Sequence, residues 1–222
     1  MTSTTITRLG PLQRMQHFIT QETANDVVRR PRDRGLYIDP HPTAGVTFFA
    51  TDGVRLGVWH EEGAIPGEKD LFLSDGVIKR LLHRDATFDD LVTIDTDHKI
   101  VSNQRARFKF NAQRGTFTTP YWQNYVPARD DFMSGDIGNL DPRLLNSFAS
   151  IAPEETYVIM PYPEKQAYLI AFPSIPSFFG ALAATTDNVA PKRPYMRKGR
   201  TSAELTPSEL LQRLRQISPT NE

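Results

Sequence analysis

The side chains that could carry acid–base or metal chemistry are scattered along the chain. Asp95, Asp97 and His98 form the tightest group, but Asp-Thr-Asp-His between two apolar runs is more typical of a hairpin turn than of a metal site. No histidine pair has the H-x-x-x-H spacing that places two metal ligands on one face of a helix. The histidines are His17, His41, His60, His83 and His98.

Catalytic motifs are also missing. The sequence contains no G-x-S-x-G, no phosphate-binding loop and no dinucleotide fingerprint. We therefore expect neither catalytic residues, nor a metal, nor a cofactor, and an enzyme is the least favoured class.

Composition narrows the class further. The 222 residues carry 26 basic and 26 acidic side chains, so net charge draws the protein neither to nucleic acid nor to an acidic membrane, although a local basic patch still could. The absence of cysteine excludes disulfides and thiolate chemistry. No apolar run is long enough to span a bilayer, and the start lacks the apolar core of a secretory signal. We expect a cytoplasmic protein with no membrane partner.

The clearest local signal is a polar turn between two apolar runs. Val46–Ala50 and Leu56–Trp59 flank Thr51-Asp52-Gly53. Asp-Gly at this place predicts a β-hairpin, because Gly adopts positive φ freely and Asp tolerates it.

Amphipathic helices are expected on either side of this hairpin. Over residues 12–24, Leu12, Met15 and Ile19 fall on one face at helical spacing, with Phe18 beside them. A second helix over 76–84 can be capped by Ser74 or Asp75. It turns its basic residues largely outward: Lys79, Arg80, His83 and Arg84.

Strands and a third helix complete the pattern. Asp141-Pro142 predicts a helix start, because an acidic N-cap followed by Pro at the first helical position is a strong signal. The expected strands cover residues 35–38, 71–73, 91–94, 98–101, 105–110, 157–160, 167–172 and 178–183.

The order strand–helix–strands occurs twice in the first 128 residues, and a third copy opens over 134–151 with a strand that starts at Ile137. Two helices on one face of an antiparallel sheet make an α+β architecture. We predict domains at 1–128 and 129–187, the second reduced, followed by a basic linker and an amphipathic helix within 188–222.

Four stretches of the chain, at residues 30–38, 50–56, 72–82 and 107–127, resemble motifs of the bacterial DNA sliding clamps, the beta subunit of DNA polymerase III. Ala50 to Leu56 reads A-T-D-G-V-R-L and resembles the family's A-T-D-G-H-R-L. Arg30-Pro31 with Gly35–Ile38 resembles R-P-x-L-N-G-x-L-x, and 72–82 resembles V-P-x-K-x-L-x-E-L-x-R. Residues 107–127 resemble the stretch that ends D-G-x-F-P-D-Y-x-x-V-x-P.

These matches run from about residue 11 to 128 and correspond to the middle domain of a clamp subunit. Residues 136–151 are similar to the start of the last clamp domain, and 157–161 to its closing Y-V-x-M-P-M-R. Nothing resembles the first clamp domain. The resemblance implies the DNA-clamp fold in a shortened, divergent relative.

The resemblance also implies a hydrophobic groove for partner peptides. Val54 replaces the family's His, and Asp33 stands where the family has an apolar Leu, so altered specificity or affinity is expected. The groove would be formed by Thr51, Gly53, Val54, Arg55, Leu56, Asp33, Val158, Met160 and Pro161.

Clamp helices face duplex DNA, which implies non-specific phosphate contacts by the basic residues of both helices. These would be Arg14, His17, Lys79, Arg80, His83 and Arg84. The favoured function is a clamp-like accessory protein of DNA replication or repair, a homo-oligomer that binds duplex DNA and the clamp-binding peptides of polymerases or repair proteins. The alternative is a clamp-derived interaction module, of host or mobile-element origin, that binds replisome partners or the host clamp without encircling DNA.

Overall fold

The computed structural model describes residues 4–19, 35–41, 43–68, 70–82, 86–110, 140–162 and 167–184. The chain divides into two compact units, Met1–Tyr121 and Trp122–Glu222. The predicted domain limits near residues 128 and 187 lie outside the described residues and stay predictions, as does the helix within 188–222.

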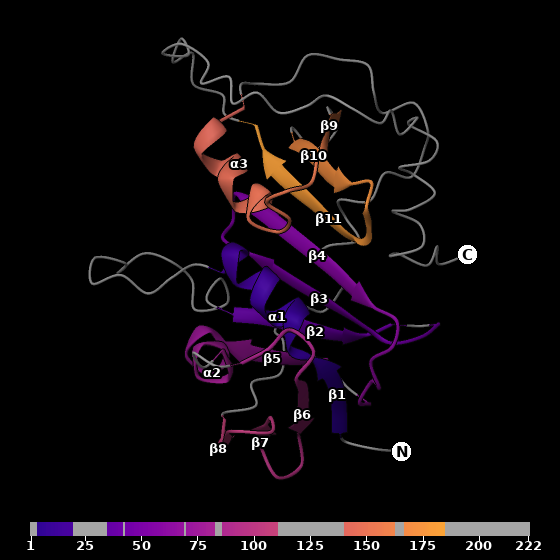
Figure 1. Cartoon of the computed structure of the whole chain (residues 1–222), viewed down its shortest axis with the longest axis vertical. Coiled ribbons are helices and arrows are strands. Elements are labelled where there is room, and N and C mark those ends of the chain that lie inside the picture. Colours follow the sequence, from indigo (N-terminus) through magenta and orange to yellow (C-terminus); the bar gives the residue numbers. More distant parts are fainter. Residues whose placement is uncertain are drawn as a thin grey trace. The chain divides into compact units, whose positions relative to one another are not determined.

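The first unit is built from two copies of one five-element pattern, a strand, a helix and three more strands (Figure 1). The predicted duplication is therefore confirmed. The first copy comprises β1 (Thr4–Arg8), α1 (Leu9–Met15) with a 3-10 turn η1 (Gln16–Phe18), β2 (Gly35–Pro40), β3 (Val46–Thr51) and β4 (Arg55–Glu61). The second comprises β5 (Leu71–Ser74), α2 (Asp75–Leu81), β6 (Leu91–Asp95), β7 (Ile100–Ser102) and β8 (Arg107–Lys109).

The two copies exchange their first strands. β1 joins the second copy in the antiparallel sheet β1-β6-β7-β8, where Thr4 pairs with Asp95. β5 joins the first copy in the order β5-β2-β3-β4, where Ser74 pairs with Gly35. Neither copy can complete its sheet alone, so the duplication folds as one body.

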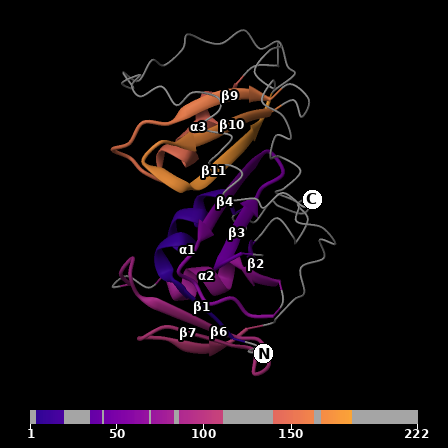
Figure 2. The same ribbon diagram turned by 90° about the vertical axis from the view of Figure 1, so that its right-hand side faces the viewer.

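Helices α1 and α2 contact each other and pack on the same sheet, α1 against β3 and β4 and α2 against β2 and β5 (Figures 1 and 2). The expected apolar face of the first helix is buried, with Leu12, Met15 and Phe18 fully inaccessible. On α2, Ile78 and Leu81 are likewise fully inaccessible. Burial of these side chains is the main source of stability for helices of only two turns.

An aromatic ladder crosses the sheet. Tyr37 on β2 stacks on Phe49 of β3, with ring centroids 4.7 Å apart, and its other neighbour is Phe72 of β5 at 4.8 Å. All three residues are cross-strand partners, and such pairs stabilise sheets directly. The ladder fixes the register by which β5 attaches to β2.

The described part of the second unit contains one helix followed by three strands. These are α3 (Pro142–Ala149), β9 (Val158–Tyr162), β10 (Ala167–Phe172) and β11 (Ile175–Ala183), with strand order β11-β10-β9. Asp141 caps α3 as predicted, because its Oδ1 accepts from the N–H of Arg143 at 2.9 Å. The strand that was expected to begin at Ile137 lies outside the described residues.

The first helix differs from its predicted range of 12–24. It begins at Leu9, and the helical turns end at Phe18, because Ile19 is extended with φ −83° and ψ 130°. Its first N–H groups are capped from a distant loop: the N–H of Leu9 donates to Asp90 O at 2.8 Å, and the N–H of Gly10 donates to Phe88 O at 2.9 Å. Because the capping carbonyls lie about 80 residues away in the sequence, the residues around Leu9 carry no local signal for the start of a helix.

The second helix is also shorter than predicted. It covers Asp75–Leu81 and ends at Leu82, whose ψ of 49° is not helical. Ser74 occupies the N-cap position without a side-chain cap bond, and Asp75 instead pairs with Lys79 one turn on. Of the helices that the structure describes, none is long and apolar enough to cross a membrane.

Several strand assignments also change. β7 begins at Ile100 and not at His98 as predicted, because His98 and Lys99 belong to the turn, where Lys99 adopts φ +55°. β8 is limited to Arg107–Lys109, because the Asn103 side chain accepts from the N–H groups of Arg105 and Ala106 and forms a turn there. β11 begins earlier than predicted, at Ile175. β1 had no predicted counterpart, since its buried positions are Thr5 and Thr7 and give no apolar alternation.

Candidate functional site

The turn between β3 and β4 is organised by the side chain of Asp52. Its Oδ1 accepts from the N–H of Val54 at 3.0 Å and from the N–H of Arg55 at 2.7 Å. Its Oδ2 accepts hydrogen bonds from Arg55 Nε at 2.8 Å and from Arg55 Nη2. The Arg55 side chain is only 19% exposed, so this ion pair is largely shielded from water.

Thr51 and Gly53 complete the turn. Thr51 Oγ1 donates to Arg55 O at 2.7 Å and accepts from the N–H of Gly53 at 3.0 Å. Gly53 has φ +87°, whereas Asp52 does not adopt positive φ. The hairpin is therefore confirmed, but the reason given for Asp52 was wrong: Asp52 acts through its carboxylate and not through a left-handed backbone.

The predicted groove residues differ in accessibility. Thr51 and Leu56 are buried, at 6% and 3% exposure, and Val54 is 44% exposed. Gly53 is also exposed. In the second unit, β9 carries Val158 and Pro161, both half-buried, and Met160, which is buried. Asp33 lies outside the described residues. In the first unit, the surface open to a ligand is thus the turn tip and the edge of Arg55.

Phe18 packs directly on the strand that follows this turn. A Cβ built on Gly57 would lie 2.5 Å from Phe18 Cδ2, so only glycine admits the ring at this place. His17, next to Phe18, lies near the turn: burial lowers its pKa, and the positive charge of Arg55 lowers it further. Helix α1 and the β3–β4 turn thus form one local cluster.

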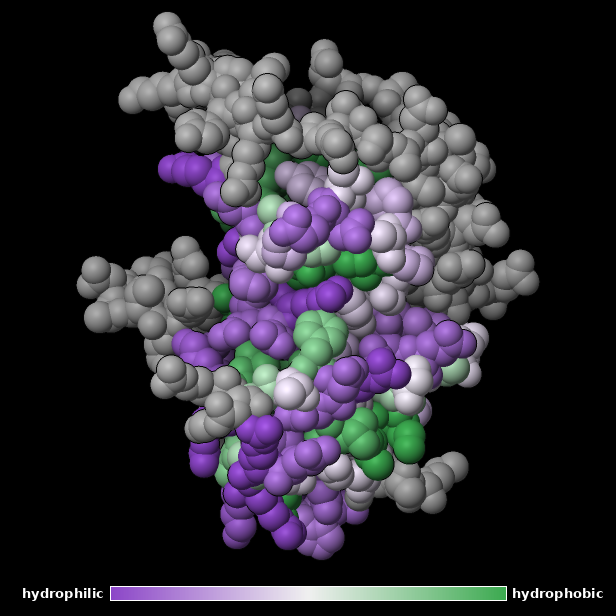
Figure 3. Space-filling view, viewed as in Figure 1, coloured by the Kyte–Doolittle hydropathy of each residue, from purple (hydrophilic) through white to green (hydrophobic). Residues whose placement is uncertain are grey.

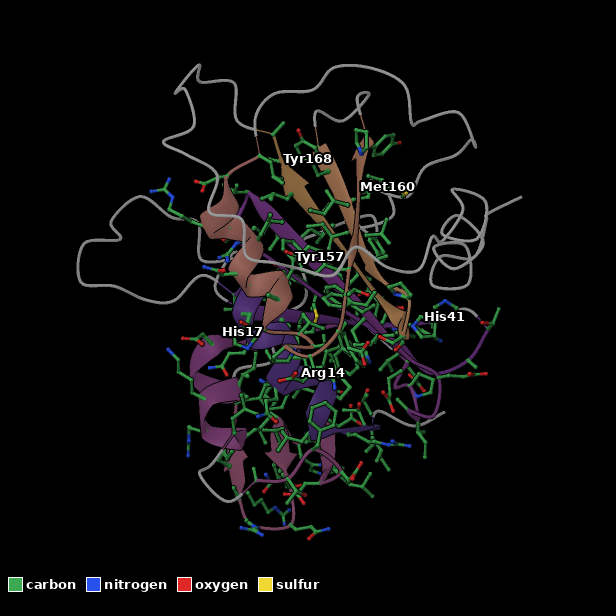
Figure 4. The ribbon with its side chains drawn as sticks, turned by 45° about the horizontal axis from the view of Figure 1, so that its top comes forward. Arg14, His17, His41, Tyr157, Met160 and Tyr168 are labelled. Atoms are coloured by element: carbon green, nitrogen blue, oxygen red, sulfur yellow. The ribbon has the colours of Figure 1, made fainter. Side chains whose placement is uncertain are left out.

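Arg14 is held between two aromatic rings. Its guanidinium carbon lies 5.0 Å from the centroid of Trp59 on β4 and 4.6 Å from that of Phe88. Burial lowers the pKa of Arg14. Figure 4 labels Arg14 and His17, which lie on α1 and η1. This stacking holds α1 against the loop that caps it. The Arg14 cation thereby interacts with aromatic rings of the protein itself.

The cationic side chains on α2 are more exposed to solvent than Arg14. Lys79 has a side chain 46% exposed and pairs with Asp75 Oδ2 at 2.5 Å. Arg80 is exposed, with its guanidinium 4.1 Å from the centroid of Phe108 on β8. His83 and Arg84 lie outside the described residues. Among the described members of the proposed DNA-binding set, Lys79 and Arg80 offer the most accessible charge.

The contact between His41 and His60 was not predicted from the sequence. The rings of His41 and His60 lie with centroids 4.1 Å apart, and His41 Nδ1 lies 2.9 Å from Thr43 Oγ1. Burial and the neighbouring His41 lower the pKa of His60 to about 4. The two residues are 19 positions apart in sequence, and only the β2–β3–β4 meander brings them together.

The described part of the chain contains no group of three or more His, Cys, Asp or Glu side chains that could hold a metal ion. At the turn where Asp95 and His98 were considered as a metal cluster, Asp95 Oδ2 lies 2.7 Å from His98 Nδ1. Hydrogen bonds from His98 lower the pKa of Asp95, so this pair closes a hairpin.

The exposed surface is mixed in polarity. On the face drawn in Figure 3, hydrophilic side chains of the described residues are interrupted by small, separate hydrophobic patches. Among the residues that the structure describes, the exposed large hydrophobic side chains are Val54, Ile65, Phe88 and Leu91. Val54 stands among them at the tip of the β3–β4 turn.

Solved structures of bacterial clamps have a similar fold. The chain is similar to the Helicobacter pylori beta clamp crystallised with 3,4-difluorobenzamide, at TM-score 0.61 and 9% identity over 84% of this chain and 67% of the other. The Pseudomonas aeruginosa sliding clamp matches at TM-score 0.57 and 12% identity, over 83% and 66%. A DNA polymerase III beta subunit from Eubacterium rectale matches at 0.56 and 12%, over 83% and 65%.

The chain has the bacterial sliding-clamp fold. The predicted fold is thereby confirmed, and so is the resemblance to a shortened, divergent relative. This clamp-fold chain spans about 65% of the length of the beta subunits that it matches. No family model matches it, and no curated protein matches it in sequence.

Proposed function

We propose that this clamp-fold protein is an accessory factor of DNA replication or repair that binds duplex DNA without sequence preference and tethers partner proteins through short peptides. The observation that carries the proposal is the pair of adjacent helices on one face of the sheet β5-β2-β3-β4, with cationic side chains on both. We propose a cytoplasmic protein without catalytic activity, acting as a polymerase processivity factor in a homo-oligomer.

For DNA, Lys79 and Arg80 on α2 would contact phosphates, supported by Arg14 and His17 on α1 and by His83 and Arg84. When exposed cations of this kind bind phosphates, they release the counterions that are condensed on the DNA. Binding is then independent of sequence and steeply dependent on salt concentration. Asp75 beside Lys79 competes with phosphate for that charge, so the contribution of Lys79 should be modest.

For peptides, the groove would begin at the β3–β4 turn. Val54 supplies exposed apolar surface, and the Arg55 stem, fixed by Asp52, gives a rigid wall. Val158 and Pro161, both half-buried, would supply further apolar surface, whereas the buried Met160 would support β9 and Thr51, Gly53 and Leu56 would support the turn. Another clamp, that of Helicobacter pylori, has been crystallised with a DNA ligase peptide, which suggests the class of peptide to test.

DNA binding is tested by comparing nicked circular duplex with linear duplex of equal length at several salt concentrations. An encircling protein is retained on the circle and slides off open ends. The double variant Lys79→Gln/Arg80→Gln should reduce the slope of log affinity against log salt by about 0.9 for the Arg80 contact, and by at most about 1.8 if Lys79 also makes a full phosphate contact. Lys109→Gln is the matched control, because Lys109 is an exposed cation on β8 and not on a helix. Absence of binding to either duplex rejects the DNA half of the proposal.

Peptide binding is tested by titrating a clamp-binding peptide, such as one from a DNA ligase, against the wild type and Asp33→Leu. A carboxylate under an apolar peptide costs desolvation energy, so the variant should bind more tightly. The control is Asp97→Leu, at an exposed acidic residue in the β6–β7 turn. If neither wild type nor Asp33→Leu binds, the groove does not exist.

The second candidate is a clamp-derived interaction module that binds replisome partners or a clamp without encircling DNA. The observation in its favour is that three basic side chains already have internal partners: Arg14 with Trp59 and Phe88, Lys79 with Asp75, and Arg80 with Phe108. Peptide binding without retention on nicked circles would select this function.

A further inference from the structure

His41 and His60 lie against each other at one end of the β2–β3–β4 meander, with their ring centroids 4.1 Å apart. His41 directly follows β2, at the turn into β3, and is buried (Figure 4). His60 lies on β4 opposite Thr47 of β3 and is half-buried. The turn itself is exposed at Thr43 and Ala44, so the histidine pair lies close to solvent.

Two buried polar atoms beside this pair lack a hydrogen-bond partner. Among the described residues, these atoms include Thr47 Oγ1 and His60 Nδ1, and Thr47 is only 1% exposed. Directly opposed residues of an antiparallel pair project from the same face of the sheet, so the two side chains are neighbours. An unpaired buried polar atom is costly, and two at one place indicate a ligand that pairs with them.

Hydrogen bonds determine which ring nitrogens can offer a lone pair. The His60 ring makes a hydrogen bond to the main chain of Val46, and because Nδ1 has no partner, Nε2 is the donor and Nδ1 carries the lone pair. His41 Nδ1 lies 2.9 Å from Thr43 Oγ1 and 3.4 Å from the Thr43 main-chain nitrogen. In the tautomer whose Nδ1 donates to Thr43 Oγ1, His41 Nε2 carries the lone pair. Metal-binding histidines have this pattern, since their second nitrogen donates to an oxygen of the protein.

The surroundings suit a cation that prefers nitrogen ligands. Burial and the neighbouring His41 lower the pKa of His60 to about 4, so its imidazole is neutral at physiological pH. Glu62 lies near enough to oppose this shift in pKa, which places a negative charge close to the rings. Neutral imidazole suits Zn²⁺, Cu²⁺ and Ni²⁺, whereas Mg²⁺ and Ca²⁺ prefer oxygen ligands.

We propose that His41 and His60 bind one divalent ion of the Zn²⁺, Ni²⁺ and Cu²⁺ class, through His41 Nε2 and His60 Nδ1. A two-histidine site is smaller than the groups of three or more ligands that the described residues lack. Water would therefore complete the coordination sphere, and a bound water can pair with Thr47 Oγ1. The ion would join the β2–β3 turn to β4 and stabilise the folded chain, because only the meander brings its ligands together. This inference depends on the fold and not on DNA or peptide binding.

The test is calorimetric titration of Zn²⁺ into the full, untagged chain at neutral pH, with the wild type, His41→Gln, His60→Gln and His98→Gln compared. The wild type should bind one ion per chain. Loss of either ligand should weaken binding by at least about tenfold, since even the outer partner of a metal ligand contributes about that much. His98→Gln is the matched control and should bind as the wild type does, because His98 is an exposed histidine beside the carboxylate of Asp95. Mg²⁺ should give no heat of binding.

Nitrogen-15 NMR of the wild type gives a second measurement that needs no variant. Zn²⁺ should shift the ring-nitrogen signals of His41 and His60 and leave those of His98 unchanged. A wild type that binds no Zn²⁺, wild-type affinity in His41→Gln or His60→Gln, an equal loss of affinity in His98→Gln, or shifts confined to other histidines would each overturn the proposal.

Discussion

The carboxylate of Asp52 binds both the main chain and the side chain of Arg55: Oδ1 accepts from its main-chain N–H at 2.7 Å, and Oδ2 accepts from its Nε at 2.8 Å. The same residue pair thus closes the turn and fixes the cation. The most conspicuous motif of the sequence is therefore self-contained, and its Arg55 is held in place before any ligand arrives.

Replacing Asp52 should destabilise this turn. Asp52→Asn keeps an acceptor for the main chain but removes the charge opposite Arg55, whose side chain is 19% exposed. We expect the free energy of unfolding to fall by about 1–3 kcal/mol, as for loss of a largely buried charged hydrogen bond. Urea denaturation measures this. Asp97→Asn, at an exposed turn position, should stay within about 0.5 kcal/mol of wild type. Equal losses in the two variants would contradict the prediction.

A methyl group should be harmful at Gly57 and harmless at Gly76. The Gly57→Ala side chain would meet the fully buried Phe18 ring at 2.5 Å, so we expect a loss of about 1–3 kcal/mol. A Cβ on Gly76 in α2 meets nothing within 4 Å, and Gly76→Ala should raise stability by about 0.5–1 kcal/mol. Thermal and chemical denaturation of both variants report the difference. Gly57→Ala with wild-type stability would mean that Phe18 does not pack on this strand.

Arg14 should contribute to stability by stacking its guanidinium on two aromatic rings. Arg14→Lys keeps the charge but loses the planar guanidinium between Trp59 and Phe88, so unfolding should become easier by about 0.5–2 kcal/mol. Arg107→Lys on β8, where the side chain is exposed, is the matched control and should be neutral. If both lysine variants are as stable as wild type, the stacking has no energetic role.

Acid should weaken the fold between about pH 6.5 and 4 through His60. Its folded pKa of about 4 lies below the ordinary 6.5, so the unfolded chain binds the proton more tightly and stability falls as pH falls through this window. The ring is only partly buried, so we discount the effect to roughly 1–2 kcal/mol. His17, whose pKa is also lowered, acts in the same direction.

The measurement is urea denaturation at pH 7 and at pH 5. His60→Gln should remove a substantial part of the acid loss while leaving His41 in place. The carboxylates with lowered pKa values, such as Asp90 and Asp95, lose their contribution only at lower pH. A His60→Gln variant with the full acid sensitivity of wild type would assign the loss to other groups.

Sequence reasoning succeeded where the signal is local. The Asp-Gly turn, the buried stripe of Leu12, Met15 and Phe18, and the Asp141 cap each depend on residues within a few positions of one another. Prediction failed where the partner is distant. The start of α1 is set by carbonyls of Phe88 and Asp90, and β1 is a strand because it pairs with β6.

The candidate site shows the same division. The residue types at the β3–β4 turn were identified from the motif, but the burial of Thr51 and Leu56 follows from packing. The stacking of Arg14 and of Arg80 needs aromatic partners from other elements, which no spacing reveals. The pairing of His41 with His60 arises from the meander in the same way.

The exchange of first strands has a consequence for biosynthesis. Thr4 cannot find its partner Asp95 until some 90 further residues have left the ribosome. Until β5 has also emerged, the first copy lacks its neighbour along β2, and such exposed strand edges invite pairing with other nascent chains. Pairings between residues so far apart in sequence also form slowly. We therefore expect this protein to fold late in translation and to benefit from chaperones that shield strand edges.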